Sequence, residues 1–313
     1  MVPNHIIVYL LELSVQIMNE KHLFDANFAN RLVSKQFPNF ANFLIQPLAS
    51  GGTDNAVFRL GNELAIRIPV ASYAGGQLQK EIDLLPRFSH LPLPVPEIVG
   101  VGELSALLND KWYIYRWIEG EDVTKQPLVD LHLQATSLAV FILELRNVSP
   151  LPKYASGEHN HSRGVALAEL DQPTRTAIST VSDEFESNVL QVLWNDALSA
   201  QPHSAPAAWL HGDLHAGNML ADANGNLAAI IDFGLAGVGD PAIDLMPAWW
   251  VFDRESRDVF KRALNAGQAE WARGRGWALS VALNAYSYYR GSDKTQLTKM
   301  SREAIVRLLS DAD

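Results

Sequence analysis

The sequence predicts an α+β fold, in which an N-terminal antiparallel sheet with one main helix precedes a larger, mostly helical C-terminal region. Ahead of Gly120, short β-prone segments bounded by turn residues accompany one main helical pattern. Beyond Gly120, apolar residues recur mainly at helical spacing. We therefore predict a boundary at Gly120, with an extension over 1–24, an N-terminal lobe over 25–119 and a C-terminal lobe over 120–313.

Composition places the chain among ordinary globular proteins. Its 313 residues are enough for about two domains, and 48% are apolar while 19% are charged. The net charge of −10 argues against a nucleic-acid partner and favours cationic or neutral ones. The absence of cysteine excludes disulfides, thiolate zinc sites and cysteine nucleophiles.

The N-terminal residues include an apolar run over 6–18 that Glu12 interrupts. No basic segment precedes this run, no small-residue cleavage site follows it, and it is too short to span a bilayer. We therefore expect a cytoplasmic protein without a membrane segment. Met18 is an alternative start, which leaves open whether residues 1–17 belong to the native protein.

A helix and a glycine loop are the first regular features. Asp25 precedes a helical pattern that runs to Phe37, where Pro38 stops it. Paired glycines then lie between two β-prone stretches within 48–60. Backbone N–H groups of such a loop can fold over phosphates, although a Gly-Gly turn alone more often marks a plain hairpin. The candidate phosphate-binding residues of this loop are Ser50, Gly51, Gly52, Thr53 and Asn55.

A strand over 63–69 and a helix over 77–88 follow the loop. Arg67 lies in the strand, and its planar fork of donors can hold phosphate oxygens. Glu81 lies in the helix, next to Lys80. The alternative is that these residues are ordinary surface charges.

An aromatic strand over 111–119 leads into Gly120, and a well-patterned core helix is expected over 131–145. Aromatic residues at this spacing more often fill a sheet core than stack on a nucleobase. The segment 150–164 is a long polar loop that holds His159, Asn160, His161 and Arg163. The loop lacks a matched carboxylate and a helical pair of histidines, which disfavours a metal site. We therefore interpret it as part of the wall of the acceptor-substrate site.

The most informative stretch is a polar loop over 211–218 followed by a hairpin. Its apolar flanks, an Asn-Gly turn and a returning strand over 227–231 predict that the hairpin brings Asp213, Asn218 and Asp232 to one end of a small sheet. Two carboxylates and an amide oxygen form a hard-oxygen site of the kind that Mg²⁺ takes, together with substrate phosphates.

One carboxylate of this group can remain free of metal and accept a proton from an attacking hydroxyl. These are the parts that phosphoryl transfer requires. The alternative is an ordinary polar loop and strand end, which becomes less plausible because both halves occur in order and are joined by a hairpin.

The spacing matches the pattern H-x-D-x-x-x-x-N followed by D-F-G, which is typical of kinases. Gly212 replaces the arginine of protein kinases, and His215 and Gly217 lie inside the loop. With these residues the chain resembles the aminoglycoside phosphotransferase family of small-molecule kinases over about residues 25–305. The resemblance implies a two-lobed, protein-kinase-like fold.

The resemblance also implies roles for the matching residues. Asp213 would orient and deprotonate the acceptor hydroxyl, Asn218 and Asp232 would hold Mg²⁺, and His211 would brace the loop backbone. Two further acidic residues, in a segment that resembles the family's G-D-P-x-x-D-L, would brace the catalytic loop and cap the next helix. They are Asp240 and Asp244.

The donor would be ATP or GTP, held by the glycine loop and by Arg67 paired with Glu81. Arg67 stands where the family pattern has lysine, which is the largest departure from it. The backbone of the inter-lobe hinge would pair with the adenine edge, without a tryptophan stack. The hinge residues are Arg116, Trp117 and Ile118.

The sequence thus predicts an ATP-dependent or GTP-dependent O-phosphotransferase that uses Mg²⁺ and acts on a hydroxyl group of a small molecule, such as an aminoglycoside or another amino or sugar compound. Arg67 favours an alternative, a nucleotide-binding pseudokinase that acts as a regulatory module. A protein kinase is disfavoured because no A-P-E pattern follows Asp232. The acceptor, the choice between ATP and GTP, a role in antibiotic resistance and the oligomeric state stay open.

Overall fold

The computed structural model describes residues 24–48, 54–71, 74–105, 110–292 and 295–311. The chain divides into two compact units. One comprises the described residues up to His90 together with Pro94–Glu119, and the other comprises Leu91–Leu93 and the chain from Gly120 onward. The four predicted loop residues that precede Asp54, and the predicted extension up to residue 23, lie outside the described residues.

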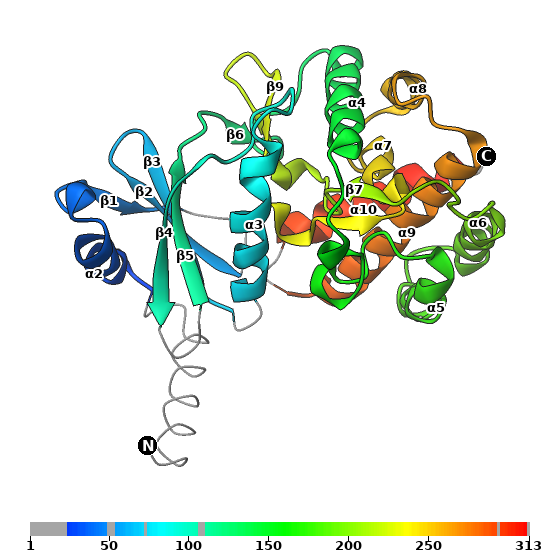
Figure 1. Ribbon diagram of the computed structural model, residues 1–313. Coiled ribbons are helices and arrows are strands. Elements are labelled where there is room, and N and C mark those ends of the chain that lie inside the picture. The colour runs from blue at the N-terminus through cyan, green and yellow to red at the C-terminus, as the bar shows by residue number, and fades with distance from the viewer. Residues whose placement is uncertain (1–23, 49–53, 72–73, 106–109, 293–294, 312–313) are drawn as a thin grey trace. The chain divides into compact units, whose positions relative to one another are not determined.

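The first unit is built on a five-stranded antiparallel sheet with the strand order β1-β2-β3-β5-β4 (Figure 1). Two α-helices accompany this sheet in the described part of the unit. Its elements are α2 (Ala26–Gln36), β1 (Ile45–Pro47), β2 (Asn55–Leu60), β3 (Leu64–Pro69), α3 (Ala74–Phe88), β4 (Ile98–Ser105) and β5 (Asp110–Arg116).

The register of this sheet separates an apolar face from a polar one. Arg67 of β3 pairs with Val57 of β2 and with Tyr113 of β5. Because neighbouring residues of a strand point to opposite faces, these three side chains share one face. Ile66 and Trp112 belong to the other face, where they pack in a buried cluster with residues of α2. The sheet therefore presents Arg67 on the face opposite its apolar core.

The helix α2 begins where the sequence predicts. The Asp25 carboxylate accepts a hydrogen bond from the backbone N–H of Phe28 at 2.7 Å, which satisfies one of the N–H groups that a helix start leaves without an intrahelical partner. Ala29 and Val33 are buried on the face that meets the sheet.

The helix α3 begins earlier than predicted. We expected it to start at Gln77, after the glycine pair, whereas the structure starts it at Ala74 and includes both glycines. A β-carbon on Gly75 would lie 2.2 Å from an oxygen of the Asp110 side chain. Glycine at this position thus accommodates the Asp110 side chain at the start of β5, and it does not mark a break in the helix.

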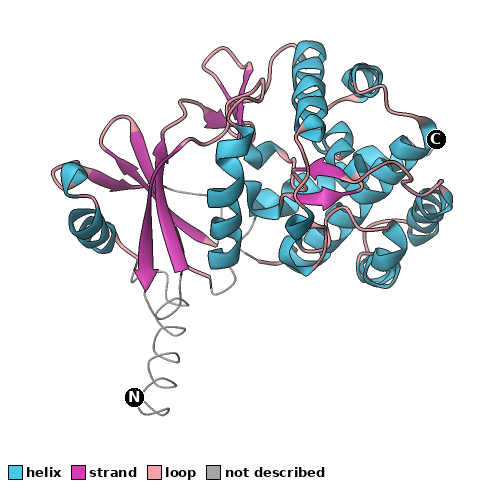
Figure 2. Cartoon of the chain, viewed as in Figure 1, coloured by secondary structure: helices cyan, strands magenta, loops and turns pink. Residues whose placement is uncertain are grey.

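The second unit is mainly helical and contains two small sheets, with strand orders β6-β8-β9 and β10-β7 (Figure 2). Its strands are β6 (Glu121–Asp122), β7 (Ala208–Leu210), β8 (Met219–Ala221), β9 (Leu227–Ile230) and β10 (Gly237–Gly239). Its helices are α4 (Leu131–Asn147), α5 (Asp171–Thr180), α6 (Ser187–Ser199), α7 (Pro247–Trp250), α8 (Arg254–Ala263), α9 (Gln268–Tyr289) and α10 (Thr295–Leu309).

The hairpin expected after the polar loop is present. Strands β8 and β9 pair antiparallel with Met219 opposite Ile230, and Gly225 in the turn has φ +78°, a conformation that glycine adopts without strain. This pairing returns the chain from the end of the polar loop to the D-F-G segment. None of the helices in the described ranges combines the length and the apolar character that crossing a membrane requires.

Candidate active site

The polar loop 211–218 connects β7 to β8 in the second unit. The residues that flank it, Leu210 and Met219, are fully buried, so both ends of the loop are anchored in the core. The loop itself contains Gly212 with φ +81°, which permits the sharp change of direction between His211 and Asp213.

His211 links the two halves of the motif. Its buried ring places Nε2 3.1 Å from the carbonyl oxygen of Ile231, and its Nδ1 accepts the backbone N–H of Asp213 at 3.3 Å. Burial lowers the pKa of His211, which favours the neutral ring with its proton on Nε2. The imidazole thus holds the backbone at Asp213 and at the residue before Asp232.

Asp244 holds the same loop from the opposite direction. Its side chain is fully buried and accepts the backbone N–H groups of His211 at 2.7 Å and Gly212 at 2.8 Å. Burial raises the pKa of Asp244, although its hydrogen bonds and the nearby His211 favour the ionised form. Asp244 therefore occupies the bracing position that the sequence suggested.

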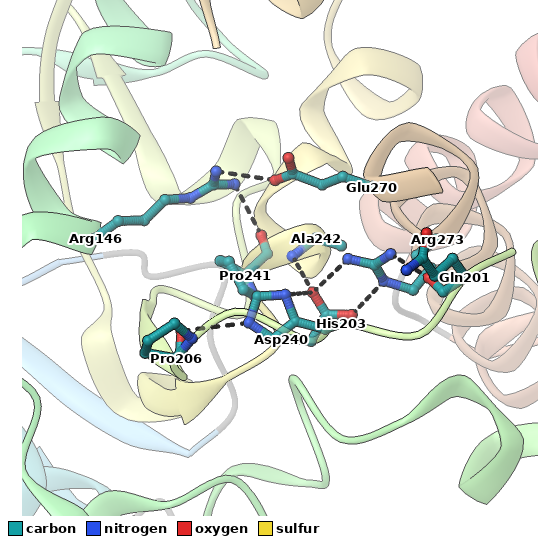
Figure 3. Close-up of polar contacts among 9 residues, drawn as sticks. All are labelled: Arg146, Gln201, His203, Pro206, Asp240, Pro241, Ala242, Glu270 and Arg273. Carbon is teal, nitrogen blue, oxygen red and sulfur yellow. Dashed lines mark hydrogen bonds and ion pairs between the residues drawn. The ribbon is translucent and has the colours of Figure 1, made fainter. Parts of the chain in front are cut away.

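Asp240 anchors the segment that carries Asp244. Its carboxylate caps the next helical turn by accepting the N–H of Ala242 at 3.1 Å, and it accepts two hydrogen bonds from Arg273, at 2.6 and 3.3 Å (Figure 3). Arg273 also donates to the carbonyl oxygen of Gln201 at 2.6 Å. His203 lies 3.7 Å from Asp240 at the rim of this group.

A second arginine secures the neighbouring peptide. Arg146 of α4 donates to the carbonyl oxygen of Pro241 at 3.2 Å and forms an ion pair with Glu270 of α9 at 2.9 Å (Figure 3). The segment before Asp244 is consequently fixed by side chains from α4 and α9, which are more than 100 residues apart in the sequence.

Asp213 and Asn218 are in direct contact. The Asn218 amide nitrogen donates to the backbone oxygen of Asp213 at 2.9 Å and to its carboxylate at 3.0 Å. Burial alone would raise the pKa of Asp213, but His215, Arg163 and His211 outweigh it and hold the pKa well below its usual range. Asp213 is therefore ionised throughout the neutral range.

His215 is a contributor that the sequence did not single out. Its Nδ1 accepts the N–H of Gly217 at 3.0 Å, which leaves Nε2 to carry the proton, and Nε2 lies 3.5 Å from the Asp213 carboxylate. In the sequence this histidine contributes only to the family resemblance, without a role of its own. The better signal was its position two residues after Asp213 in a loop that must turn back.

Asp232 lies next to Asn218 because the hairpin pairs their neighbours. The N–H of Ile231 donates to the carbonyl oxygen of Asn218 at 3.0 Å, and Asp232 itself has φ +67°. A non-glycine residue in the left-handed region is costly, by about 1–3 kcal/mol, and such residues gather at functional sites. The Asp232 carboxylate accepts the N–H of Gly234 at 3.4 Å.

These residues fit Mg²⁺. The Asn218 amide nitrogen is directed at Asp213, so its oxygen is the end that can bind a cation, and the Asp232 carboxylate supplies a second hard ligand. Within the described residues, no group of three His, Asp or Glu side chains is placed to hold a metal. Mg²⁺ at this position would complete its coordination with phosphate oxygens or water.

Arg67 of the first unit is held on several sides. It lies 3.5 Å from the Glu81 carboxylate, which is completely buried and also accepts the Tyr113 hydroxyl at 2.9 Å. With its amide turned to present oxygen, Asn55 accepts from Arg67 at 3.2 and 3.0 Å. The predicted partnership of Arg67 and Glu81 is thus present, and Asn55 joins it.

The predicted hinge residues lie at the end of β5, whose last residue is Arg116. The N–H of Arg116 donates to the carbonyl oxygen of Glu97 at 2.9 Å, and the N–H of Trp117 donates to the carbonyl oxygen of Glu63 at 2.8 Å. This leaves Ile118 as the predicted hinge position whose backbone N–H carries no such bond within the described part of the chain.

An open cavity of about 580 Å³ lies beside Trp117 in the first unit. The Arg59 guanidinium covers the Trp117 ring at 4.1 Å and pairs with Glu119 at 3.0 Å. The Arg59 guanidinium thus covers the face of the Trp117 ring on which a nucleobase would otherwise stack. The cavity is lined by Gln46, Pro47, Leu48, Arg59, Trp117 and Glu119.

Comparison with known proteins identifies relatives of this architecture. The model of the phosphotransferase enzyme family matches residues 45–277. The structure of the GDP complex of aminoglycoside 2'-phosphotransferase-IIIa is similar, with a TM-score of 0.69 and 17% identity over 92% of this chain and 99% of that one. ADP-bound APH(2'')-Ib matches with a TM-score of 0.59 and 20% identity, over 91% and 98% of the two chains.

The ternary complex of streptomycin, ATP and APH(2'')-IIa is a third similar structure, with a TM-score of 0.60 and 18% identity, over 87% of this chain and 93% of that one. These likenesses confirm the predicted kinase-like fold, with its N-terminal antiparallel sheet and its larger helical part. No curated protein matches the sequence.

We predict that Asp244→Asn destabilises the polar loop. Asparagine offers one acceptor oxygen where the carboxylate offers two, so the N–H of His211 or Gly212 is left buried without a partner. Such a loss costs about 1–3 kcal/mol. Urea unfolding measures the change in the free energy of unfolding, and Asp196→Asn is the matched control because Asp196 is exposed and pairs with Arg275 away from the loop. Equal stability of the two variants would contradict the bracing role.

Proposed function

The chain belongs to the phosphotransferase enzyme family, and we propose that it moves the γ-phosphoryl group of ATP or GTP to a hydroxyl group of a small molecule. The observation that carries this proposal is the contact between an ionised Asp213 and Asn218, with Asp232 next to Asn218 across the hairpin. The proposal is supported by the chemistry of this short stretch, in which one carboxylate can accept a proton and two further side-chain oxygens can bind a metal.

In the proposed reaction the acceptor hydroxyl approaches phosphorus as its proton passes to the Asp213 carboxylate. A new O–P bond forms, and the bond between the γ-phosphorus and the β-phosphate oxygen breaks, which releases the nucleoside diphosphate. Because Asp213 is a weak base, its main contribution is to orient the hydroxyl, and proton transfer comes late, as suits a loose transition state. His215 and Asn218 hold the carboxylate in place.

Asn218 and Asp232 would hold Mg²⁺, which when bound neutralises charge on the phosphate oxygens. We assign Arg67 to the donor phosphates, with Glu81 and Asn55 fixing the direction of its guanidinium. Arginine binds phosphate oxygens through parallel N–H groups, so this substitution for lysine preserves a positive donor at the position.

The acceptor we propose is a small hydroxylated molecule, and aminoglycosides are the first class to examine because similar structures are of aminoglycoside phosphotransferases. The acidic chain disfavours nucleic acid as a partner. We place the reaction in the cytoplasm, where ATP and GTP are available as donors. The competing pseudokinase interpretation predicts nucleotide binding without turnover.

We predict that Asp213→Asn reduces phosphoryl transfer by about 10²–10⁴-fold, because the amide cannot accept the hydroxyl proton. Release of nucleoside diphosphate is measured with ATP and with GTP against aminoglycosides, macrolides, choline, homoserine and simple sugars. The exposed control Asp196→Asn should keep wild-type rates. Binding of Mg-nucleotide with no turnover by the wild type would favour the pseudokinase.

We predict that Asp232→Ala abolishes Mg²⁺-dependent turnover, because a carboxylate ligand is lost. Titration calorimetry should show that Mg²⁺ no longer strengthens ATP binding in this variant, whereas it does so in the wild type and in Asp196→Ala. Near wild-type activity in Asp232→Ala would remove Asp232 from the metal site.

We predict that His215 sets the acid limit of activity. Burial opposes its charged form, but Asp213 outweighs burial and raises the pKa of His215 above its ordinary 6.5. As pH falls through this raised pKa, the protonated ring can no longer accept the Gly217 N–H, and a positive charge develops beside Asp213. Activity should therefore decline on the acid side.

His215→Gln keeps a donor for Asp213 without titrating, so its rate of transfer should lose the acid decline above pH 6.5 or shift it to lower pH. Asp213 stays ionised across this interval and does not contribute to the decline. The exposed His132→Gln is the control. An unchanged profile in His215→Gln would assign the acid limit to another group.

A further inference from the structure

The last part of the long polar loop is fixed around Arg163. Asn160 is completely buried, its oxygen accepts the N–H of Gly157 at 3.0 Å, and its nitrogen donates to the carbonyl oxygen of Arg163 at 2.9 Å. The next carbonyl, that of Gly164, accepts the N–H of Asp240 at 2.8 Å. The backbone that follows the Arg163 Cα is therefore held by the buried Asn160 side chain and by Asp240, which anchors the segment that braces the catalytic loop.

The backbone here is also strained. His161 has φ +52°, Ser162 has φ +58° and Gly164 has φ +84°. Two successive non-glycine residues in the left-handed region cost about 1–3 kcal/mol each, and such strain persists only where surrounding contacts determine it. These contacts hold Arg163 in one position.

That position is against the catalytic loop. A β-carbon on Gly212 would lie 3.1 Å from the β-carbon of Arg163, so the two segments are in contact. The Arg163 Nε is buried and has no hydrogen-bond partner within the described residues. The positive charge of Arg163 lies close enough to Asp213 to favour its ionised form, although the hydrogen bond to the Asp213 carboxylate comes from Asn218.

A guanidinium does not lose its proton in proteins, and the buried Nε of this half-buried arginine has an unused donor that an anion can accept. We infer that Arg163 binds the transferred phosphoryl group, an inference that rests on the proposed function. Asp213 contacts the acceptor hydroxyl, and that oxygen becomes bonded to phosphorus, so a cation packed against the Asp213 loop lies within reach of the phosphoryl oxygens.

If Arg163 binds the phosphoryl group, the second unit, which contains Asp213, supplies its own cation for that group. Gly212 occupies the position between histidine and aspartate at which protein kinases carry an arginine. Arg163 reaches the same loop from a segment about 50 residues earlier. As the γ-phosphoryl group leaves the diphosphate, charge spreads over its equatorial oxygens, which two N–H groups of one arginine can contact together. Arg163 itself undergoes no covalent change.

The experiment compares Arg163→Gln and Arg163→Lys with Arg275→Gln, a partly buried arginine of α9 that pairs with Asp196. Four quantities are measured: nucleotide hydrolysis with water as acceptor, transfer to the best acceptor, affinity for Mg-ADP with and without aluminium fluoride, and the midpoint of urea unfolding. Aluminium fluoride with ADP mimics the phosphoryl group in transit, and water as acceptor removes any contribution from acceptor binding.

We expect Arg163→Gln to lower kcat for hydrolysis and for transfer by about 10³-fold, near the lower end of what a catalytic arginine contributes. Affinity for the aluminium fluoride complex should fall in parallel, while affinity for Mg-ADP alone stays within about twofold. Arg163→Lys should recover part of kcat because it restores the charge without the planar fork. Arg275→Gln should behave as the wild type.

Three results would overturn the inference. Wild-type hydrolysis and aluminium fluoride affinity with a raised KM for the acceptor would place Arg163 in the acceptor site. A lowered unfolding midpoint in Arg163→Lys and Arg163→Gln with equal losses of Mg-ADP affinity would make Arg163 structural. Absence of turnover in the wild type would overturn the proposed function together with the inference. The first two results overturn the inference alone, because the wild type is active in both.

Discussion

The catalytic loop depends above all on the buried Asp244 carboxylate. It accepts two consecutive backbone N–H groups, those of His211 and Gly212, and thereby fixes the turn that presents Asp213. A buried carboxylate is stable only when its oxygens accept hydrogen bonds, and buried backbone N–H groups are stable only when they have an acceptor. The carboxylate and the loop backbone therefore satisfy each other. The ion pair of Asp240 with Arg273 supports Asp244 in turn, because it secures the segment from which Asp244 extends.

The ionised state of Asp213 is determined by its neighbouring side chains more than by its burial. Burial disfavours an ionised carboxylate, yet His215, Arg163 and His211 together outweigh burial. The resulting carboxylate is a weak base that is always available and rigidly held. Such a group suits phosphoryl transfer, where orienting the nucleophile and stabilising charge contribute more than strong proton abstraction.

The sequence predicted the parts of the site that depend on short-range geometry. Asp213, Asn218 and Asp232 gather because one loop and one hairpin connect them, and both carry local turn signals. It missed the role of His215, because only the hydrogen bond from Gly217 shows which ring nitrogen faces Asp213. Arg163 lies about 50 residues from the site, so only tertiary packing places it there. The early start of α3 was likewise hidden, because the contact between Gly75 and Asp110 crosses 35 residues.

The same distinction bears on Arg67, the position that most departs from the kinase pattern. From the sequence it suggested a loss of catalysis, because lysine and arginine are not interchangeable at phosphate sites. In the structure its guanidinium meets Glu81 and Asn55, and Tyr113 fixes the Glu81 carboxylate. A planar fork needs such partners to set its direction, whereas a lysine needs only one. The contacts around Arg67 therefore fit the phosphate-binding role that we propose for it, in which the departure from lysine changes the geometry of donor binding.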